Sequence, residues 1–235
     1  MDSLVSKFYK ELDSTTTDFV RDTIHKVNWE ARLVGIKGAR GIGKTTLLLQ
    51  YIKLYLADQL EKTLYVCLDS IWFNTNSLMD LVDNFSKKGG EYLFIDEVHK
   101  YPGWAQVLKN IYDDYPNLKV VFTGSSLLEI LNARADLSRR AVVYEMQGFS
   151  FREYLRMETG VDFDILSLEQ ILNNHVSEAK KIHQKIKPFQ YFETYLQQGY
   201  DHSDENVPRF RANRNALPKI LESDGDKPPL KRAFL

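Results

Sequence analysis

The chain alternates between short continuous apolar runs and segments in which apolar residues recur every three or four positions. The runs have the length and composition of buried strands, and the periodic segments predict helices with one apolar face. Strands are predicted in this way over residues 31–37, 63–69, 91–96, 117–124 and 140–147. Because continuously apolar strands separated by helices are typical of a parallel sheet covered on both faces, we expect an α/β fold with a parallel five-stranded sheet.

A helix is predicted in each interval between these strands, and another within the first 25 residues. The first of these four helices begins near residue 44, and the other three cover residues 77–88, 104–112 and 126–137. In such a sheet, ligands bind at the carboxyl ends of the strands. Polar residues that directly follow a strand are therefore the first candidates for a functional site.

The pattern changes after residue 148, where only helical periodicities remain. Helices are predicted over residues 150–157, 167–175, 177–186 and 188–199, the last with proline at its start and glycine at its end. Beyond residue 200 the apolar residues follow neither period, and four of the seven prolines occur there. We therefore expect a core over residues 1–148, a small helical region over residues 149–200, and a disordered or aberrant tail over residues 201–235.

Composition adds little to this description. The formal net charge is −1, which gives no indication of a nucleic-acid or acidic-membrane partner. The single cysteine, Cys67, excludes a disulfide within one chain and suits a reducing cytoplasm. No apolar run approaches the length of a membrane span, and the charged N-terminal stretch does not resemble a signal peptide. We expect a cytoplasmic protein without a membrane partner.

The stretch GARGIGKTT matches the phosphate-loop pattern G-x-x-x-x-G-K-[ST], with a predicted strand before it and a helix after it. Glycines let backbone N–H groups surround phosphate oxygens, and the helix directs its positive end toward the same anion. Lys44 is expected to contact the β and γ phosphates of ATP, and Thr45 to offer its hydroxyl to Mg²⁺. The nucleotide-binding residues predicted here are Gly38, Ala39, Arg40, Gly41, Ile42, Gly43, Lys44, Thr45 and Thr46.

Two adjacent carboxylates, Asp96 and Glu97, follow the third predicted strand. With a phosphate loop on the first strand, Asp96 is expected to bind Mg²⁺ directly or through water. Glu97 is expected to orient and deprotonate a water molecule for attack on the γ-phosphate. The alternative interpretation is a solvated strand end. A water-activating acid favours a hydrolase over a small-molecule kinase, which would more often avoid one.

Further candidates follow the fourth strand and precede the fifth. In the order expected for a P-loop NTPase sheet, 5-1-4-3-2, the fourth strand lies between the two motif strands, so Thr123 and Ser125 could sense the γ-phosphate. A turn built from small polar residues is the alternative. Arg139 and Arg140 precede the fifth strand, and Arg140 could reach a neighbouring subunit's nucleotide. A solvated helix end is the alternative there.

These motifs together, with YLFIDEVHKYPGW and LSRRAVVYEMQGFSFREYL, resemble the mostly uncharacterised prokaryotic AAA-type ATPases of the AAA+ superfamily. The resemblance covers roughly residues 15–200. It implies Walker A at residues 38–46, Walker B at Asp96 and Glu97, a sensor at residues 123–125 and the arginine position at Arg140. It also implies a longer C-terminal region, whereas this chain continues with DHSDENVPRFRANRNALPK, a change in character that predicts truncation or a shifted reading frame.

Two functional hypotheses result. The first is a Mg²⁺-dependent ATPase, expected to act as a homo-oligomer, whose hydrolysis drives a conformational change in an unknown protein or nucleic-acid partner. The second is a nucleotide-binding module with little turnover because the C-terminal region is missing. A P-loop kinase fits less well. Both leading hypotheses predict that ATP binds and name ATP and Mg²⁺ as the ligands.

Overall fold

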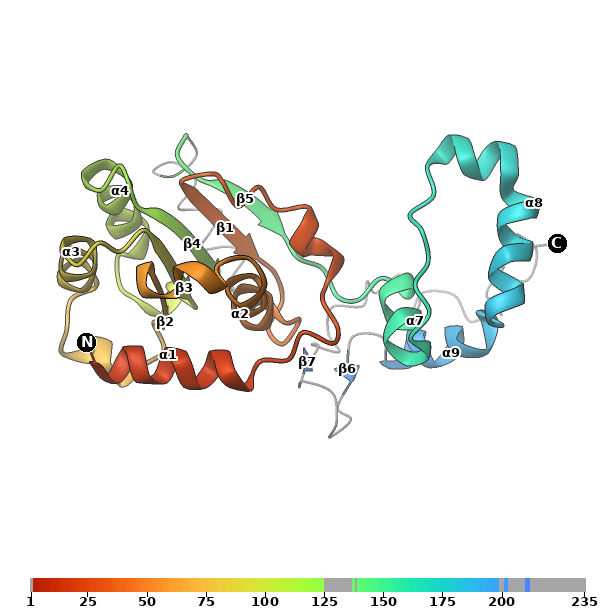
Figure 1. The fold of residues 1–235 in the computed structure, drawn as a ribbon, viewed down its shortest axis with the longest axis horizontal. Coiled ribbons are helices and arrows are strands. Elements are labelled where there is room, and N and C mark those ends of the chain that lie inside the picture. Colours follow the sequence, from red (N-terminus) through yellow and green to blue (C-terminus); the bar gives the residue numbers. More distant parts are fainter. Residues whose placement is uncertain (1, 125–136, 138, 199–200, 203–209, 212–235) are drawn as a thin grey trace, which may run out of the picture.

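The structure is a computed structural model, and it describes residues 2–124, 137, 139–198, 201–202 and 210–211. Figure 1 shows a sheet-containing core that holds the N-terminal part of the chain and a separate helical region beside it. The predicted helix over residues 126–137 lies outside the described residues, except for its last position.

The core is built on a parallel five-stranded sheet (Figure 1). Its strands are β1 (Leu33–Lys37), β2 (Thr63–Cys67), β3 (Tyr92–Asp96), β4 (Lys119–Gly124) and β5 (Val142–Glu145). They lie in the order β2-β3-β4-β1-β5, and every pairing is parallel. The predicted fold class and strand order are therefore confirmed. β4 separates β1 from β3, as expected for the two motif strands.

The central strands are apolar because both of their faces are covered. Leu33, Val34 and Ile36 of β1 are buried, as are the three residues at the centre of β3. Gly35 lies directly against the Phe122 ring of β4, and a Cβ at this position would be 2.7 Å from Phe122 Cζ. A side chain at residue 35 would thus displace the Phe122 ring, which ties this glycine to the packing at the centre of the sheet.

The helices of the core cover the sheet through their apolar faces. They are α1 (Asp2–Ser14), α2 (Lys44–Tyr55), α3 (Leu78–Lys87) and α4 (Trp104–Asp114), with short 3₁₀ helices η1 (Asp22–His25), η2 (Ala57–Lys62), η3 (Ile71–Asn74) and η4 (Val98–Lys100). α1 buries Leu4, Phe8 and Leu12 and packs along β2 and α2. It lies within the first 25 residues, where the sequence predicts a helix.

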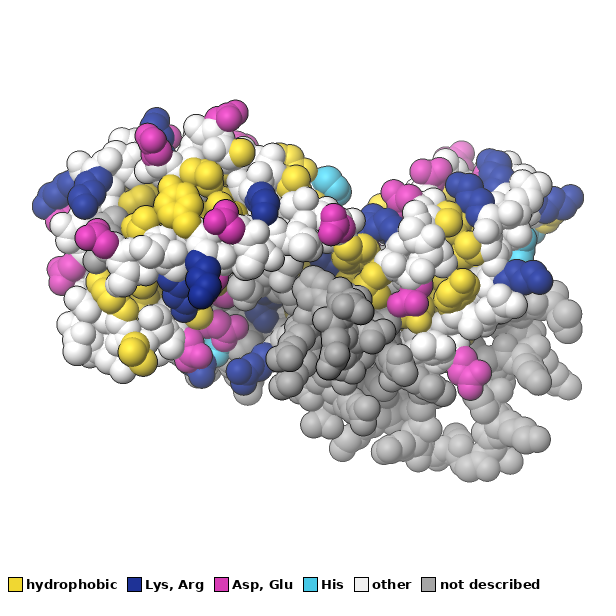
Figure 2. Space-filling view, turned by 60° about the horizontal axis from the view of Figure 1, so that its bottom comes forward, with side chains coloured by type: hydrophobic (Ala, Val, Ile, Leu, Met, Phe, Trp, Pro, Cys, Tyr) yellow, Lys and Arg dark blue, Asp and Glu magenta, His cyan; other side chains and the backbone are white. Residues whose placement is uncertain are grey.

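The helical region consists of α7 (Phe151–Thr159), α8 (Leu168–Lys185) and α9 (Phe189–Gln198). The prediction of separate helices over residues 167–175 and 177–186 was wrong, because α8 is continuous over 18 residues. Its sequence contains no glycine or proline to interrupt it, and Ser167 with Gln170 forms a capping box at its start. α8 buries none of its residues, and Figure 2 shows apolar and charged side chains exposed side by side on the helical region.

α7 and α9 pack together through a second, smaller apolar cluster. Phe149 and Tyr154 are buried in it, and Tyr195 of α9 donates a hydrogen bond to the Phe149 carbonyl at 2.8 Å. This cluster is separate from the core of the sheet. The division into residues 1–148, 149–200 and 201–235 stays a prediction.

In the tail, the structure describes an antiparallel pair of two-residue strands, β6 (Asp201–His202) and β7 (Phe210–Arg211). The expected disorder of the rest of the tail concerns residues outside the described ranges. Within the described part of the chain, no helix combines the length and the apolarity that crossing a membrane requires.

Candidate nucleotide-binding site

The predicted phosphate loop occupies residues 38–43, between the end of β1 and the start of α2. Gly41 and Gly43 have φ values of 84° and 90°, which side-chain-bearing residues rarely adopt. At Gly38, a Cβ would come within 2.3 Å of the Met146 carbonyl oxygen. The glycines of the motif are therefore required by the shape of this loop, at the carboxyl edge of the sheet.

The Lys44 side chain is buried and folds back onto the loop. Its Nζ donates hydrogen bonds to the carbonyls of Gly38 (3.0 Å) and Ala39 (2.8 Å). Burial lowers the pKa of Lys44, and the carboxylates of Glu97 and Asp96 oppose this effect. A bound anion would act in the same direction as the carboxylates, because it favours the charged ammonium.

Asp96 is the centre of a hydrogen-bonded cluster that joins three strands and the first turn of α2. Its Oδ2 accepts from Thr45 Oγ1 (2.5 Å) and from Tyr65 Oη (3.0 Å). Its Oδ1 accepts from Thr123 Oγ1 and from the Glu97 backbone N–H (3.1 Å). Thr45 and Asp96, which the sequence assigns to Mg²⁺, are thus in direct contact.

Glu97 has an unusual backbone conformation for its residue type. Its φ of 56° and ψ of 44° make it the one non-glycine residue with positive φ in the described chain. Such conformations are strained and cluster at functional sites. The Glu97 N–H also donates to Thr123 Oγ1 (3.1 Å), and Glu97 Oε2 lies 3.3 Å from His99 Nε2. The acid is therefore held by contacts on both sides.

A cavity of about 380 Å³ opens beside this cluster. Arg40, Thr45, Asp96 and Glu97 line it, as does the half-buried Cys67 at the end of β2. Two of the predicted nucleotide-binding residues, Arg40 and Thr45, thus share one space with Asp96 and Glu97.

Helix α1 contributes residues to the same cavity that the sequence did not indicate. Lys7 and Glu11 line it, with Lys7 Nζ 3.7 Å from Glu11 Oε1. Burial raises the pKa of Glu11, while Lys7 opposes this. Lys53 of α2 holds the end of α1 by donating to the Leu12 (3.2 Å) and Thr15 (2.8 Å) carbonyls. From the sequence, an i,i+4 pair on an amphipathic helix indicates only a solvated face.

Tyr65 was also missed. It lies inside an apolar run, where a tyrosine is most simply interpreted as core. Burial and the Asp96 carboxylate raise the pKa of its hydroxyl far above the ordinary value. The hydroxyl therefore stays a hydrogen-bond donor to Asp96, a role for which the sequence carries no signal.

Arg140 lies away from the chain's own phosphate loop. In the register of the sheet Val142 pairs with Val34, so Arg140 lies at the amino-terminal edge, opposite the loop. Its Nε and Nη2 each bind a different oxygen of Asp113 at 2.9 Å. The role of Arg140 toward a neighbouring subunit stays a prediction. Ser125 lies outside the described residues, and Arg139 is exposed.

The donor set suits magnesium. Thr45 and Asp96 supply the hard oxygen ligands that Mg²⁺ prefers, and the ion normally completes its shell with phosphates and water. Among the described residues, no group of three or more His, Cys, Asp or Glu could hold a metal by itself. The residues therefore fit a metal that binds together with a nucleotide.

Comparison with known proteins bears on this assignment. A family model described as an AAA domain matches residues 30–155. The uncharacterized protein MJ1637 of Methanocaldococcus jannaschii is 33% identical over 193 residues, which cover 78% of this chain and 40% of MJ1637. The chain thus spans less than half the length of this relative.

The solved structures similar to this chain include an ADP complex and a replication initiator. The Hsp104–ADP complex of S. cerevisiae is 19% identical, with 66% of this chain and 25% of that chain covered and a TM-score of 0.42. PCH-2 of C. elegans is 17% identical (70% and 56% covered, TM-score 0.40). DnaA of Aquifex aeolicus bound to AMPPCP is 14% identical (75% and 62% covered, TM-score 0.40).

The family match includes the phosphate loop, the Asp96–Glu97 pair, Thr123 and the first half of α7. It covers more than half of the chain and coincides with the part in which the sheet and the hydrogen-bonded cluster are found. The chain therefore belongs to the AAA+ family of P-loop NTPases.

Proposed function

We propose that this chain is a magnesium-dependent ATP hydrolase of the AAA type. The observation that carries the proposal is the hydrogen bond from Thr45 to Asp96, beside the buried Lys44. Thr123 also donates a hydrogen bond to Asp96. This arrangement joins a phosphate-binding loop to a metal-binding carboxylate at one edge of the sheet. Family membership supports nucleotide binding and an ATPase activity.

The loop and Lys44 bind the phosphates in this proposal. The ammonium exchanges its contacts with the Gly38 and Ala39 carbonyls for phosphate oxygens, with which it forms stronger, charge-assisted hydrogen bonds. The start of α2 lies at the same place and adds its positive end. Both features act on the negative charge of the triphosphate.

Thr45 and Asp96 would hold Mg²⁺, which neutralises charge on the β and γ phosphates when it is bound. Tyr65 and Thr123 fix the Asp96 carboxylate in place by donating to its two oxygens. A carboxylate that is already oriented loses little conformational freedom when it binds a ligand. These two hydroxyl groups thus prepare the site for the metal.

Glu97 would accept the proton of the attacking water. Its backbone is fixed by hydrogen bonds from its N–H to Asp96 and Thr123, and His99 lies beside its carboxylate. General-base assistance of this kind contributes about 10² to 10⁴ in rate. In AAA-type function, hydrolysis would then drive a conformational change in a protein or nucleic-acid partner, with the chain acting as a homo-oligomer in the cytoplasm.

One observation favours a second candidate, a nucleotide-binding module with little turnover. Both ends of the Arg140 guanidinium are engaged by Asp113 of the same chain. If this pair persists, Arg140 does not reach a neighbouring nucleotide, and the transition state lacks an arginine besides Lys44 and the metal. ATP would then bind without rapid hydrolysis.

Phosphate release separates the two candidates. The purified chain with ATP and Mg²⁺ should release phosphate, and Glu97→Gln should lower this rate by about 10² or more while nucleotide affinity stays near that of the parent. The matched control is Glu91→Gln, since Glu91 precedes the same strand and pairs with the exposed Lys62. Glu97→Gln turnover equal to the parent would exclude Glu97 as the base. Tight binding without turnover in the parent would favour the module.

A further inference from the structure

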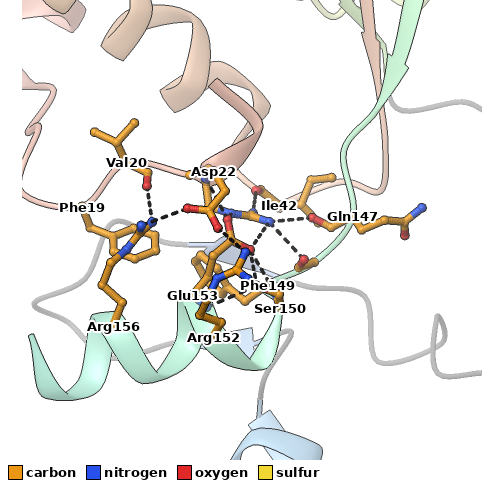
Figure 3. Close-up of polar contacts among 12 residues, drawn as sticks. Phe19, Val20, Asp22, Ile42, Gln147, Phe149, Ser150, Arg152, Glu153 and Arg156 are labelled. Atoms are coloured by element: carbon orange, nitrogen blue, oxygen red, sulfur yellow. Dashed lines mark hydrogen bonds and ion pairs between the residues drawn. The ribbon is translucent and has the colours of Figure 1, made fainter. Parts of the chain in front are cut away.

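Arg21 is a buried charge that the assignments above leave unused. It precedes η1, and only 4% of its surface is exposed. Its guanidinium lies 4.4 Å from the centre of the Phe149 ring, which is labelled in Figure 3. Burying an arginine is costly unless its donors are bonded, so its partners indicate what it is for.

The guanidinium joins its own segment to two others that are distant from it in sequence, the phosphate loop and residues 147–153; Ile42, Gln147 and Glu153 of these segments are labelled in Figure 3. Its Nε and Nη2 bind the two carboxylate oxygens of Glu153 on α7, at 2.9 and 3.3 Å. Its Nη2 also donates to the carbonyls of Gln147 (2.9 Å) and Gly148 (3.0 Å), which follow β5. Its Nη1 donates to the Ile42 carbonyl at 3.1 Å, inside the phosphate loop.

Glu153 is fixed as firmly as its partner. Its carboxylate also accepts from the N–H of Asp22 (2.9 Å) and from the N–H and Oγ of Ser150 (both 3.0 Å), which forms the capping box of α7. Burial raises the pKa of Glu153, but the hydrogen bond and charge of Arg21 outweigh this and lower it to about 2. The pair is thus charged at neutral pH and bonded to the start of α7.

The contact with Ile42 controls the orientation of one peptide group. Ile42 lies between Gly41 and Gly43, both at positive φ, so its peptide has more rotational freedom than elsewhere in the loop. The Ile42 C=O and the Gly43 N–H belong to the same planar trans peptide and point in opposite directions. When Arg21 binds the carbonyl, the Gly43 N–H is directed away from Arg21.

We propose that Arg21 is a positioning residue of the phosphate loop, which directs the Gly43 N–H toward a bound phosphate and is itself held by Glu153 of α7. The inference rests on the proposed nucleotide binding at this loop. Because coupling between two sites is reciprocal, the position of α7 affects nucleotide affinity and a bound nucleotide stabilises the start of α7.

Arg21→Lys tests the role of the guanidinium. Lysine keeps the charge, but its single nitrogen replaces the three nitrogens with which Arg21 reaches Ile42, Gly148 and Glu153. The dissociation constant for ATP should therefore rise about 10-fold, the loss of one hydrogen bond to a charged group. The matched control is Arg156→Gln. Arg156 binds Asp22 (2.9 Å) and the Val20 carbonyl (2.6 Å), so it joins the same segments without touching the loop. Its loss should lower the melting temperature and change ATP affinity less than about twofold.

Glu153→Gln provides a second variant in case Arg21→Lys does not fold. It removes the charge that orients Arg21 and should weaken ATP binding by about 3-fold. In the double variant the two effects should combine to less than their product, as expected for residues that act through one contact. If the double variant weakens ATP binding by the full product of the two single effects, Arg21 and Glu153 do not act through their contact.

Amide exchange gives a readout that a purely structural role would not change. In the parent, ATP should slow amide exchange in residues 149–158. In Arg21→Lys, saturating ATP should still slow amide exchange in the phosphate loop but no longer in residues 149–158. Equal ATP affinity in parent and Arg21→Lys would overturn the inference and leave the proposed function intact. Equal weakening in Arg21→Lys and Arg156→Gln would also overturn it. A parent chain that binds no ATP would overturn both.

Discussion

Asp96 shows how single residues prepare this site before any ligand binds. Hydroxyl groups from the start of α2, from β2 and from β4 all donate to its two oxygens. The motif pattern predicted Thr45, Asp96 and Thr123 because their positions relative to strand ends are visible in the sequence. Tyr65 could not be predicted, since an inward-facing tyrosine in a buried strand is indistinguishable from core until its hydroxyl partner is known.

Lys44→Ala tests the phosphate loop at this scale. The variant loses the ammonium that is buried in the loop, so ATP affinity should fall by about 10- to 100-fold, the range expected for charge-assisted hydrogen bonds. Calorimetric titration measures this directly. Lys62→Ala is the control, because Lys62 is exposed and pairs with Glu91. Unchanged affinity in Lys44→Ala would refute the loop assignment.

At the scale of elements, the strands and their order followed from the sequence, whereas contacts between distant segments did not. Continuous apolar runs identify buried strands, and the phosphate loop marks the end of the first strand along the chain. Arg21 and Glu153 are 132 residues apart, and no local sequence pattern indicates that they bind each other. The continuity of α8 was also missed, because its helical pattern was divided near Val176 although no breaker occurs there.

The start of α7 should show an acid-dependent stability. The folded-state pKa of Glu153 is about 2 against an ordinary value of 4.5, so its carboxylate stabilises the fold above pH 4.5 and loses this effect as the pH falls toward 2. The shift corresponds to on the order of 3 kcal/mol. Between pH 6 and pH 2, the free energy of unfolding should fall more in the parent than in Glu153→Gln.

Denaturant unfolding at several pH values measures this difference. Glu169→Gln, at the exposed first turn of α8, serves as the control and should follow the parent at every pH. Parallel curves for the parent and Glu153→Gln would show that the Arg21–Glu153 pair does not contribute to stability through its charge.

At the scale of the whole molecule, the core and the helical region differ in how completely they are packed. Strands β1 to β4 are largely buried, whereas α8 exposes Leu168, Leu172 and Val176 along its length. The family match ends within α7, and MJ1637 extends well beyond the length of this chain. Assembly therefore has to be tested on the protein itself.

Arg140 provides that test. If it acts on a neighbouring subunit, specific activity should rise with protein concentration, and Arg140→Ala should remove this rise while ATP affinity stays nearly unchanged. An arginine supplied in trans contributes about 10³ to 10⁵ in rate in well-studied NTPases. Asp113→Asn weakens the hold on Arg140 within the chain and should keep the concentration dependence. Constant specific activity over a hundredfold dilution would indicate that Arg140 only binds Asp113.

Cys67 gives the cavity beside Asp96 a chemical property of its own. It is the single cysteine of the chain, and it lines the cavity at the end of β2. Burial raises the pKa of its thiol to about 11, so at pH 7 only about one molecule in 10⁴ carries the reactive thiolate. Because oxidants and alkylating reagents attack the thiolate, we expect Cys67 to react slowly with both at neutral pH.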